Sequence, residues 1–354
     1  MSEILLADVL QAIGICGAPN TPNVDAGNYH AFLANVQPPQ LPVFESISDE
    51  EMVGDGYSQT IRNLRNTYWS NKPWNVAGLL NDHIASILLN GWQGGTVTTT
   101  PRTSPSKDIA AVMNVINSSP KLFSLFRKLG GEEFLHSTMA PNTFSIAQEG
   151  EADPTMNFDL INTGHHLDAD ELEDEEFDPA DILAAPEYEY FHGAATEVTA
   201  TDGVETYNWT ADGSLISLSV EGNRNVDIRR RPGDSFRTVG DHNSGAFARK
   251  IRNARPTAGI RLKVDLGASL REYKAMVAKR KLTGLTIVFN GYNKIGVGTD
   301  DYEFEIKAPK SQFQMIEGDT DQDFGALSLN IQPLRDSVTK GYYVNRTRTS
   351  KTLI

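Results

Sequence analysis

The chain has almost no cysteine and no long apolar run. Cys16 is the single cysteine among 354 residues, so no disulfide can form within one chain, and a reducing compartment or an assembly without crosslinks is expected. No apolar stretch approaches the roughly 18 residues that a membrane-spanning helix needs, so we expect no membrane anchor. Glu3 and Asp8 stand where a secretory signal carries basic residues, and we therefore expect no export signal.

Motifs for catalysis and cofactor binding are also missing. The chain contains no P-loop, no Gly-x-Ser-x-Gly and no His-Glu-x-x-His sequence. Residues 296–301 lack the third glycine of a dinucleotide loop. His165 and His166, beside Asp168, have no second group of ligands at metal spacing, and the acidic run that follows does not fit a calcium loop. We predict that the protein is not an enzyme and that it holds no cofactor or metal.

Charged residues are abundant but segregated along the chain. Residues 1–223 hold 8 basic and 32 acidic side chains, residues 224–281 hold 16 and 5, and the remainder hold 8 and 9. The acidic block comprises Asp168, Asp170, Glu171, Glu173, Asp174, Glu175, Glu176 and Asp178. The basic block comprises Arg229, Arg230, Arg231, Arg249, Lys250 and Arg252.

Three interpretations of the basic block compete. It could contact nucleic acid through phosphates, but Phe236 and Phe247 are the only aromatic residues between Arg224 and Arg255, which disfavours a base-stacking groove. It could be a solvated positive surface. It could also pair with the acidic block of another copy, a heterologous contact that builds rings or filaments. We favour this third interpretation and predict that both blocks are oligomer interfaces.

Apolar spacing predicts several helices in the first third of the chain. A short amphipathic helix is expected over residues 1–14, followed by an extended arm with five prolines over 17–44. Further helices are expected over 74–91, 106–119 and 119–130, where apolar residues recur every three or four positions.

Beyond about residue 140 the apolar period changes to two. The segments NTFSIAQEG, LISLSVEG and GIRLKVDL alternate apolar and polar residues, which is typical of strands with one buried face. A helix over 269–281 should begin with a capping box of Ser269 and Glu272 and bury Leu270, Tyr273 and Val277. The segments LTIVFNG, YEFEIKAP, SQFQMIEG and LSLNIQPL follow as strands, and the tail after residue 339 should be extended. This order predicts a mainly β (α+β) fold, an antiparallel β-sandwich or half-barrel.

The same pattern resembles the major tail tube proteins of long-tailed bacteriophages. The likeness lies in SDEEMVGDGYS (48–58), the segment from Trp74 to Thr100, MAPNTFSIAQEG (139–150) and DGSLISLSVEGNRNVD (212–227). It continues through LTGLTIVFNG, YEFEIKAPKSQFQM and DFGALSLNIQPLRDS, so it covers roughly residues 46–337.

The resemblance implies a sandwich flanked by helices, with an N-terminal arm at 1–45, a tail-tube domain at 46–337 and a C-terminal extension at 338–354. It implies homomeric rings that join edge to edge and stack into a tube in the virion tail, assembled in the host cytoplasm. Other copies, the tape-measure protein and other tail proteins would be the partners, and DNA would pass through the lumen without specific binding. A net charge of −14 fits such a conduit, because a basic wall would retain phosphates.

Several alternatives stay open at this stage. The long arm and the acidic block depart from the simplest family pattern, so a trimer of tandem units competes with the favoured hexamer. A ring-forming tail-end or connector protein would share the same sandwich. A carbohydrate-binding β-sandwich would instead need a pocket with converging polar groups.

Overall fold

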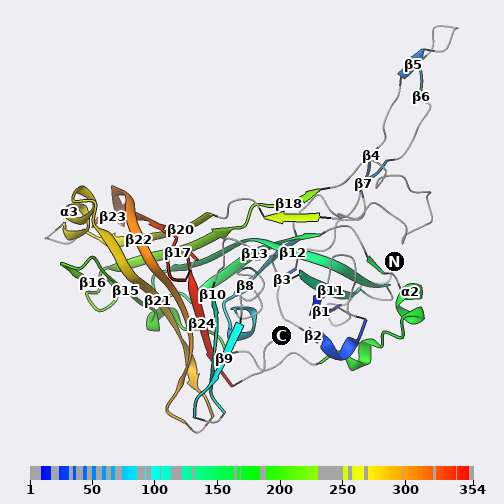
Figure 1. The fold of residues 1–354 in the computed structure, drawn as a ribbon, viewed down its shortest axis with the longest axis horizontal. Coiled ribbons are helices and arrows are strands. Elements are labelled where there is room, and N and C mark those ends of the chain that lie inside the picture. The colour runs from blue at the N-terminus through cyan, green and yellow to red at the C-terminus, as the bar shows by residue number, and fades with distance from the viewer. Residues whose placement is uncertain are drawn as a thin grey trace.

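The computed structural model is a mainly antiparallel β protein whose strands form two facing layers and a smaller third group (Figure 1). The expected β-sandwich architecture is therefore confirmed, as an open sheet rather than a closed barrel. The residues that the structure describes are 9–16, 24–31, 35–36, 43–45, 50–52, 58–60, 65–67, 74–85, 92, 97–103, 105–112, 122–129, 132–162, 166–167, 169–183, 189–229, 250–253, 257–266, 270–296, 298–321, 324–339 and 341–350.

The first layer, called layer A, contains eight strands, and every neighbouring pair is antiparallel. Its two margins are the short strand β3 beside β8 and the C-terminal half of β22. In spatial order the strands are β3 (Asn35–Val36), β8 (Trp74–Leu79), β13 (Thr155–Asn162), β12 (Glu132–Glu149), β17 (Leu215–Asn223), β20 (Thr257–Asp265), β23 (Phe324–Pro333) and β22 (Asp301–Asp321).

The second layer, called layer B, packs against layer A and shares β22 with it. The N-terminal half of β22 pairs within layer B, and a bulge between Phe313 and Met315 precedes the half that pairs with β23. Two separate strands divided at Pro309 were expected, but Pro309 lies inside this one long strand. The other members are β16 (Thr206–Asn208), β15 (Glu197–Thr201), β21 (Lys281–Lys294), β24 (Val344–Thr349), β10 (Lys107–Val112) and β9 (Val97–Pro101).

The main hydrophobic core lies between the two layers. Phe144, Val220 and Ile260 of layer A and Ile287 and Phe304 of layer B are all buried in it. Each of these residues alternates along its strand with a more exposed neighbour, as the period of two requires. Burial of one face of each layer therefore holds the sandwich together.

A third group of strands carries a second, smaller core. It contains β1 (Val9–Cys16), β2 (His30–Ala31), β11 (Leu122–Leu129), the N-terminal half of β12 and β14 (His166–Leu167). Tyr29, Phe126 and Phe177 form the aromatic centre of this core, and Leu172 is buried beside them. The acidic block is thereby attached to the fold through two apolar side chains.

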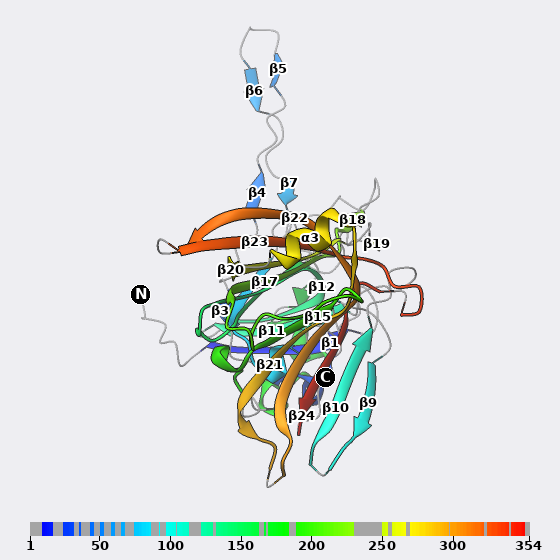
Figure 2. The same ribbon diagram turned by 90° about the vertical axis from the view of Figure 1, so that its left-hand side faces the viewer.

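Two-stranded ribbons complete the β structure. The ribbons β4 (Val43–Glu45) with β7 (Arg65–Thr67), and β5 (Glu50–Met52) with β6 (Ser58–Thr60), extend away from the layers in both views (Figures 1 and 2). A third ribbon joins β18 (Val226–Arg229) to β19 (Lys250–Asn253). Isolated two-stranded ribbons are only marginally stable in water, so such elements gain from a partner surface.

Several predicted helices are strands. The expected helix at 1–14 is wrong where the structure describes it, because Val9–Cys16 forms β1. The helices expected at 106–119 and 119–130 are wrong at β10 and β11. The helix expected at 74–91 is wrong over β8, and helix is present only at 82–85 among its described residues. The short helical elements are α2 (Ala169–Asp174), η2 (Ala26–Asn28), η4 (Pro179–Asp181) and η5 (Gly193–Ala195).

The predicted helix near residue 270 exists as α3 (Arg271–Val277), but its orientation is the reverse of the expected one. Glu272 and Ala275 are buried, whereas Leu270, Tyr273 and Val277 are exposed. Glu272 accepts a hydrogen bond from the buried Trp209 indole at 3.2 Å, which explains why a carboxylate faces inward. The predicted capping box is also wrong, since Leu270 is the N-cap and its side chain makes no capping bond.

The described part of the C-terminal tail contains the extended strand β24 (Val344–Thr349), as expected, and this strand belongs to the sheet. Strand β24 lies between β10 and β22 in layer B. The buried Tyr343 hydroxyl donates to the backbone oxygens of Glu221 and Gly259, each at 3.1 Å, and so ties the tail to layer A. The domain boundaries predicted from the sequence remain predictions.

Candidate functional site

The outer side of layer A is a broad polar surface, here called the polar face. Strands β12, β13, β17, β20 and β23 turn their apolar side chains into the main core, so the alternate positions face outward. These outward positions are almost all hydroxyl, amide or charged residues. They include Thr143, Ser145, Asn157, Asp159, Ser217, Ser219, Glu221, Asn223, Arg261, Lys263, Ser328, Asn330 and Gln332.

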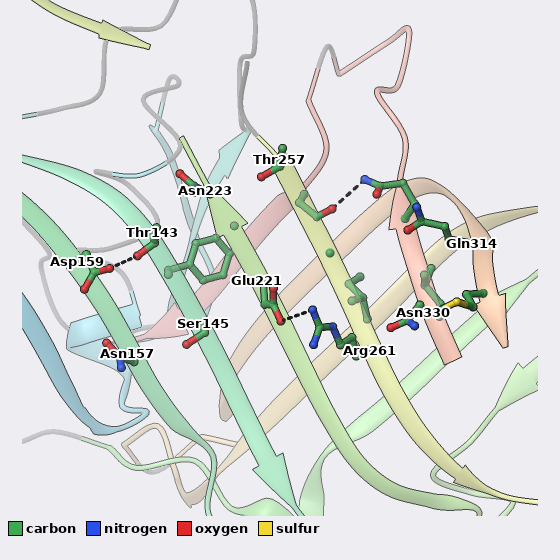
Figure 3. A pocket seen from close by; sticks show the side chains of 18 of the residues that line it. Thr143, Ser145, Asn157, Asp159, Glu221, Asn223, Thr257, Arg261, Gln314 and Asn330 are labelled. Carbon is green, nitrogen blue, oxygen red and sulfur yellow. Dashed lines mark hydrogen bonds and ion pairs between the residues drawn. The ribbon is translucent and has the colours of Figure 1, made fainter. Parts of the chain in front are cut away.

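The polar face is hollowed along its length. One open hollow of about 1060 Å³ runs from Asn75 and Asp159 on one side to Gln314 and Gln332 on the other (Figure 3). A second hollow of about 720 Å³ continues it. Both share Arg261 and Asn330 in their linings, so they form one continuous concave surface. Such a surface offers many hydrogen-bond donors and acceptors to a hydrated or polymeric ligand.

Short-range contacts hold the side chains of the polar face in place. Asp159 accepts hydrogen bonds from the Thr143 hydroxyl at 2.6 Å and from the Asn75 amide at 3.1 Å. Glu221 and Arg261, on neighbouring strands, approach to 3.5 Å as an exposed ion pair (Figure 3). An exposed pair of this kind adds little stability, so its significance lies in the charge that it places on the surface.

Negative charge predominates on the polar face. The described residues that line its two hollows include five carboxylates and two cations. The carboxylates are spread over several strands instead of converging on one point. The cations are Arg261 and Lys263, and the acids are Glu149, Asp153, Asp159, Glu221 and Glu317. A polyanion would therefore be weakly repelled along this surface.

The predicted acidic interface lies on a separate part of the molecule. Asp170, Glu173 and Asp174 are exposed on α2, and Glu175, Glu176 and Asp178 are exposed just after it. Glu171 is in the same helix, while Asp168 lies outside the described residues. The described part of the block is thus a short helix and turn with exposed carboxylates, and Leu172 and Phe177 are anchored beneath it.

The predicted basic interface is partly described. In the backbone register, Arg229 at the end of β18 pairs with Lys250 of β19, and Asp227 pairs with Arg252. Arg230, Arg231 and Arg249 lie outside the described residues. Within one chain the described ribbon and α2 are well separated (Figure 1), so the described residues of the two blocks do not meet. Their pairing between copies remains a prediction.

The residues of the polar face were not singled out in the sequence. Their signal was nevertheless present, because each strand predicted by a period of two has polar residues at its alternate positions. What a single sequence lacks is the strand order. Only the pairing of β13, β12, β17, β20 and β23 shows that these polar positions form one surface.

Comparison with known proteins gives no independent identification. No protein-family model matches the chain, and a search of curated proteins finds no significant match. Within the described residues, no cluster of three or more histidine, cysteine, aspartate or glutamate side chains is arranged to hold a metal ion. None of the described helices has the length and apolar character needed to cross a bilayer.

Proposed function

We propose that the protein is a structural subunit that self-assembles into stacked rings, forming a tube of the kind found in the tails of long-tailed bacteriophages. The observation that carries this proposal is the construction of layer A. It is an open sheet whose outer face is concave, polar and mainly acidic. Copies joined along the margins of such sheets would close a cylinder lined by that face.

The chemistry of the polar face suits a conduit for DNA. Phosphates bind to surfaces rich in lysine and arginine, and release of counterions makes that binding strong. A wall with more carboxylates than cations avoids such retention, so a nucleic acid can move through it. The many hydroxyl and amide groups keep the wall hydrated without a strong preference for any base.

The projecting ribbons support stacking of the rings. The β4–β7 and β5–β6 ribbons reach away from the layers, and α2 presents a negative surface elsewhere (Figure 1). The two ribbons lie between β3 and β8 in the sequence and project beyond that margin of layer A, where they could contact copies above or below. Ring contacts and stacking contacts would then use different surfaces.

Electron microscopy and sedimentation of the purified chain test the proposal. We expect tubes of uniform diameter, with their formation dependent on ionic strength. Single rings that never elongate would instead favour a tail-end or connector protein. A stable monomer at every salt concentration would overturn the proposal.

A carbohydrate-binding sandwich is less well supported by the polar face. Sugar sites are commonly built around an aromatic side chain with a few fixed polar groups. Among the described residues, Phe144 is the only aromatic residue that lines either hollow, and it is buried beneath the surface. Glycan-array binding at micromolar affinity together with a monomeric state would reverse this preference.

A further inference from the structure

The basic ribbon β18–β19 leaves layer A through a short segment, here called the root. The root comprises Arg224 and Asn225, which lie between the end of β17 at Asn223 and the start of β18 at Val226. Within the described part of the chain, β18 and β19 pair only with each other. A ribbon of two strands is only marginally stable in water, so its direction depends on the contacts at its root.

A β-bulge in β12 brings Asn142 to the root. Pro141 and Thr143 pair with consecutive residues of β13, so Asn142 between them is the extra residue of the bulge. A bulge bends its strand and re-aims the side chain of the extra residue. Strand β18 packs against β12, and the contact between them includes this bulge.

Asn142 holds the root through three hydrogen bonds. Its backbone oxygen accepts a bond from the Arg224 N–H at 2.8 Å and another from the Trp92 indole N–H at 2.9 Å. Its side-chain oxygen accepts a bond from the N–H of Val226, the first residue of the ribbon, at 2.9 Å. One residue of β12 therefore fixes the backbone on both sides of Asn225.

The side chain of Arg224 is anchored in the core. Arg224 is 3% exposed, and its Cζ atom lies 5.6 Å from the centre of the Trp92 ring. Burial lowers the pKa of Arg224 to about 10, so the guanidinium keeps its charge at neutral pH and is attracted to the indole ring. Trp92 in turn packs edge to face against Phe144, with ring centres 4.7 Å apart. Arg224 thus belongs to the anchor of the ribbon and not to its positive surface.

The turn between the two strands has a single, specific backbone conformation. Asn225 has a φ of 50°, in the left-handed region that asparagine tolerates better than most other residues. Its N–H donates to the side-chain oxygen of Asn223 at 2.6 Å. Rotation of the backbone at Asn225 would break this bond and the bond between Asn142 and Val226.

We infer that Asn142, Trp92 and Arg224 are positioning residues that aim the basic ribbon in one direction relative to layer A. The root thereby decides where the cations of the ribbon stand. A segment that is already fixed loses less conformational entropy when it makes a contact. The inference goes beyond the proposed function, and only its consequence for assembly rests on that function and on the predicted role of the basic block.

Spin-label distances test the fixed direction. Labels are attached at Asp227→Cys in β18 and Ser219→Cys in β17, in a Cys16→Ala background whose fold is checked by circular dichroism. Dilution with unlabelled chain restricts the measurement to distances within one molecule. We expect one narrow distance distribution. Asn142→Ala removes the acceptor of the Val226 N–H and should raise the population of other distances about tenfold. Asn142→Asp keeps an acceptor oxygen and should restore the narrow distribution.

The control variant is Asn330→Ala, because this asparagine also lies in layer A but on β23, two strands from β17. It should leave the distribution unchanged. A broad distribution in the original root, or a narrow one in Asn142→Ala, would overturn the inference.

Assembly gives a separate readout. Asn142→Ala should assemble several-fold more slowly than the original chain, and Asn142→Asp should recover the rate. Normal assembly of Asn142→Ala despite a broadened distribution would overturn the role of the root in assembly and leave the proposed function standing. If the unmodified chain forms no tubes, the proposed function fails, while the distances still decide whether the root is fixed.

Discussion

At the scale of single residues, Gly222 shows how tightly layer A is packed. A Cβ atom at this position would lie 2.5 Å from Cζ2 of Trp92 and still closer to the ring of Phe144. Both rings are buried in the core, so neither can move away cheaply. We expect Gly222→Ala to lower the free energy of unfolding by about 1–3 kcal/mol, measured by urea denaturation.

The matched control for Gly222→Ala is Gly259→Ala on the adjacent strand. Gly259 pairs with Glu221, and a Cβ atom there would have no neighbour within 4 Å. Its substitution should leave stability within about 0.5 kcal/mol of the original chain. Equal losses in the two variants would show that the backbone, and not the Trp92–Phe144 contact, requires glycine.

Asp202 makes stability depend on pH. Burial alone would raise the pKa of Asp202, but hydrogen bonds from the N–H groups of Glu205 and Val204, from the Tyr207 hydroxyl and from Arg280 outweigh it and lower the pKa to about 2. An unfolded aspartate has a pKa of about 3.9. The carboxylate therefore stabilises the fold fully above about pH 4, and this contribution is lost as the pH falls towards 2.

We accordingly expect Asp202→Asn to lower the urea midpoint at pH 7 and to differ less from the original chain as the pH falls from 4 to 2. The measurement is the midpoint for both chains across that range. Asp301→Asn serves as the control, because this exposed carboxylate lies 3.8 Å from Lys294 and should contribute little. A constant difference at all pH values would contradict the assignment of this titration to Asp202.

At the scale of elements, β24 is expected to be indispensable. Its Arg348 lies 3.0 Å from Asp108 of β10 and 2.8 Å from Glu303 of β22. Removing the strand would take both Arg346 and Arg348 away from Glu303, leave Asp108 with Arg102 as its cation, and expose the edges of two strands. A chain ending at residue 337 should therefore aggregate or fail to fold, whereas one ending at residue 350 should fold. Soluble yield and near-ultraviolet circular dichroism distinguish the two outcomes.

The elements that the sequence predicted well are strands with one buried face. Strands β12, β17 and β20 alternate apolar and polar residues, and the structure places them where the pattern indicates. Alternation of apolar and polar residues reveals a strand only when one face of the strand is exposed to solvent. The fold class could therefore be predicted from the second half of the chain. Most strands in that half lie in layer A or have one face exposed to solvent.

Two of the strands that were predicted to be helices, β1 and β11, are buried on both faces. In β11, Phe123 and Leu125 belong to the main core and Phe126 to the second core, so apolar residues stand at consecutive positions. In β1, Ile13 and Ala12 are divided between the two cores in the same way. A continuous apolar run of this length fits a helix as well as a strand, and only the partner strands decide between them.

The reversed orientation of α3 has a related cause. Its apolar residues at positions 270, 273 and 277 were assumed to face the core of their own chain. The structure buries Glu272 because Trp209 supplies a hydrogen-bond donor inside. A sequence pattern records that a face is apolar, but it does not record which molecule covers that face.

At the scale of the whole molecule, the basic block is expected to act in assembly. Reversing Arg229, Arg230 and Arg231 to glutamate would remove the positive partner of any acidic surface on a neighbouring copy. We expect assembly to be blocked while circular dichroism and thermal unfolding of the subunit stay unchanged. Sedimentation at low and high salt provides the measurement. Unchanged assembly would mean that these arginines are merely solvated.

The negative charge of the polar face can be reversed by mutation. Asp159 and Glu221 both line the large hollow. The double variant Asp159→Lys with Glu221→Lys changes the described lining of the two hollows from five carboxylates and two cations to three carboxylates and four cations. If the polar face lines a conduit, each assembled tube gains rings of cations along its lumen. Added lysines bind phosphates through counterion release, so their effect must weaken steeply with salt.

Assembled tubes of the original chain should therefore retain little DNA, and tubes of the double lysine variant should retain it at low salt and release it between about 50 and 200 mM. The control, Glu197→Lys with Glu205→Lys, makes the same change in net charge at exposed positions around β15 in layer B, away from the polar face. Retention measured after nuclease treatment separates the two sites, because DNA inside a tube is protected and DNA on its outer surface is digested. Protected DNA in the first variant alone is the result that a lumen lined by the polar face requires. Equal digestion in both variants would place this face on the outside of the assembly.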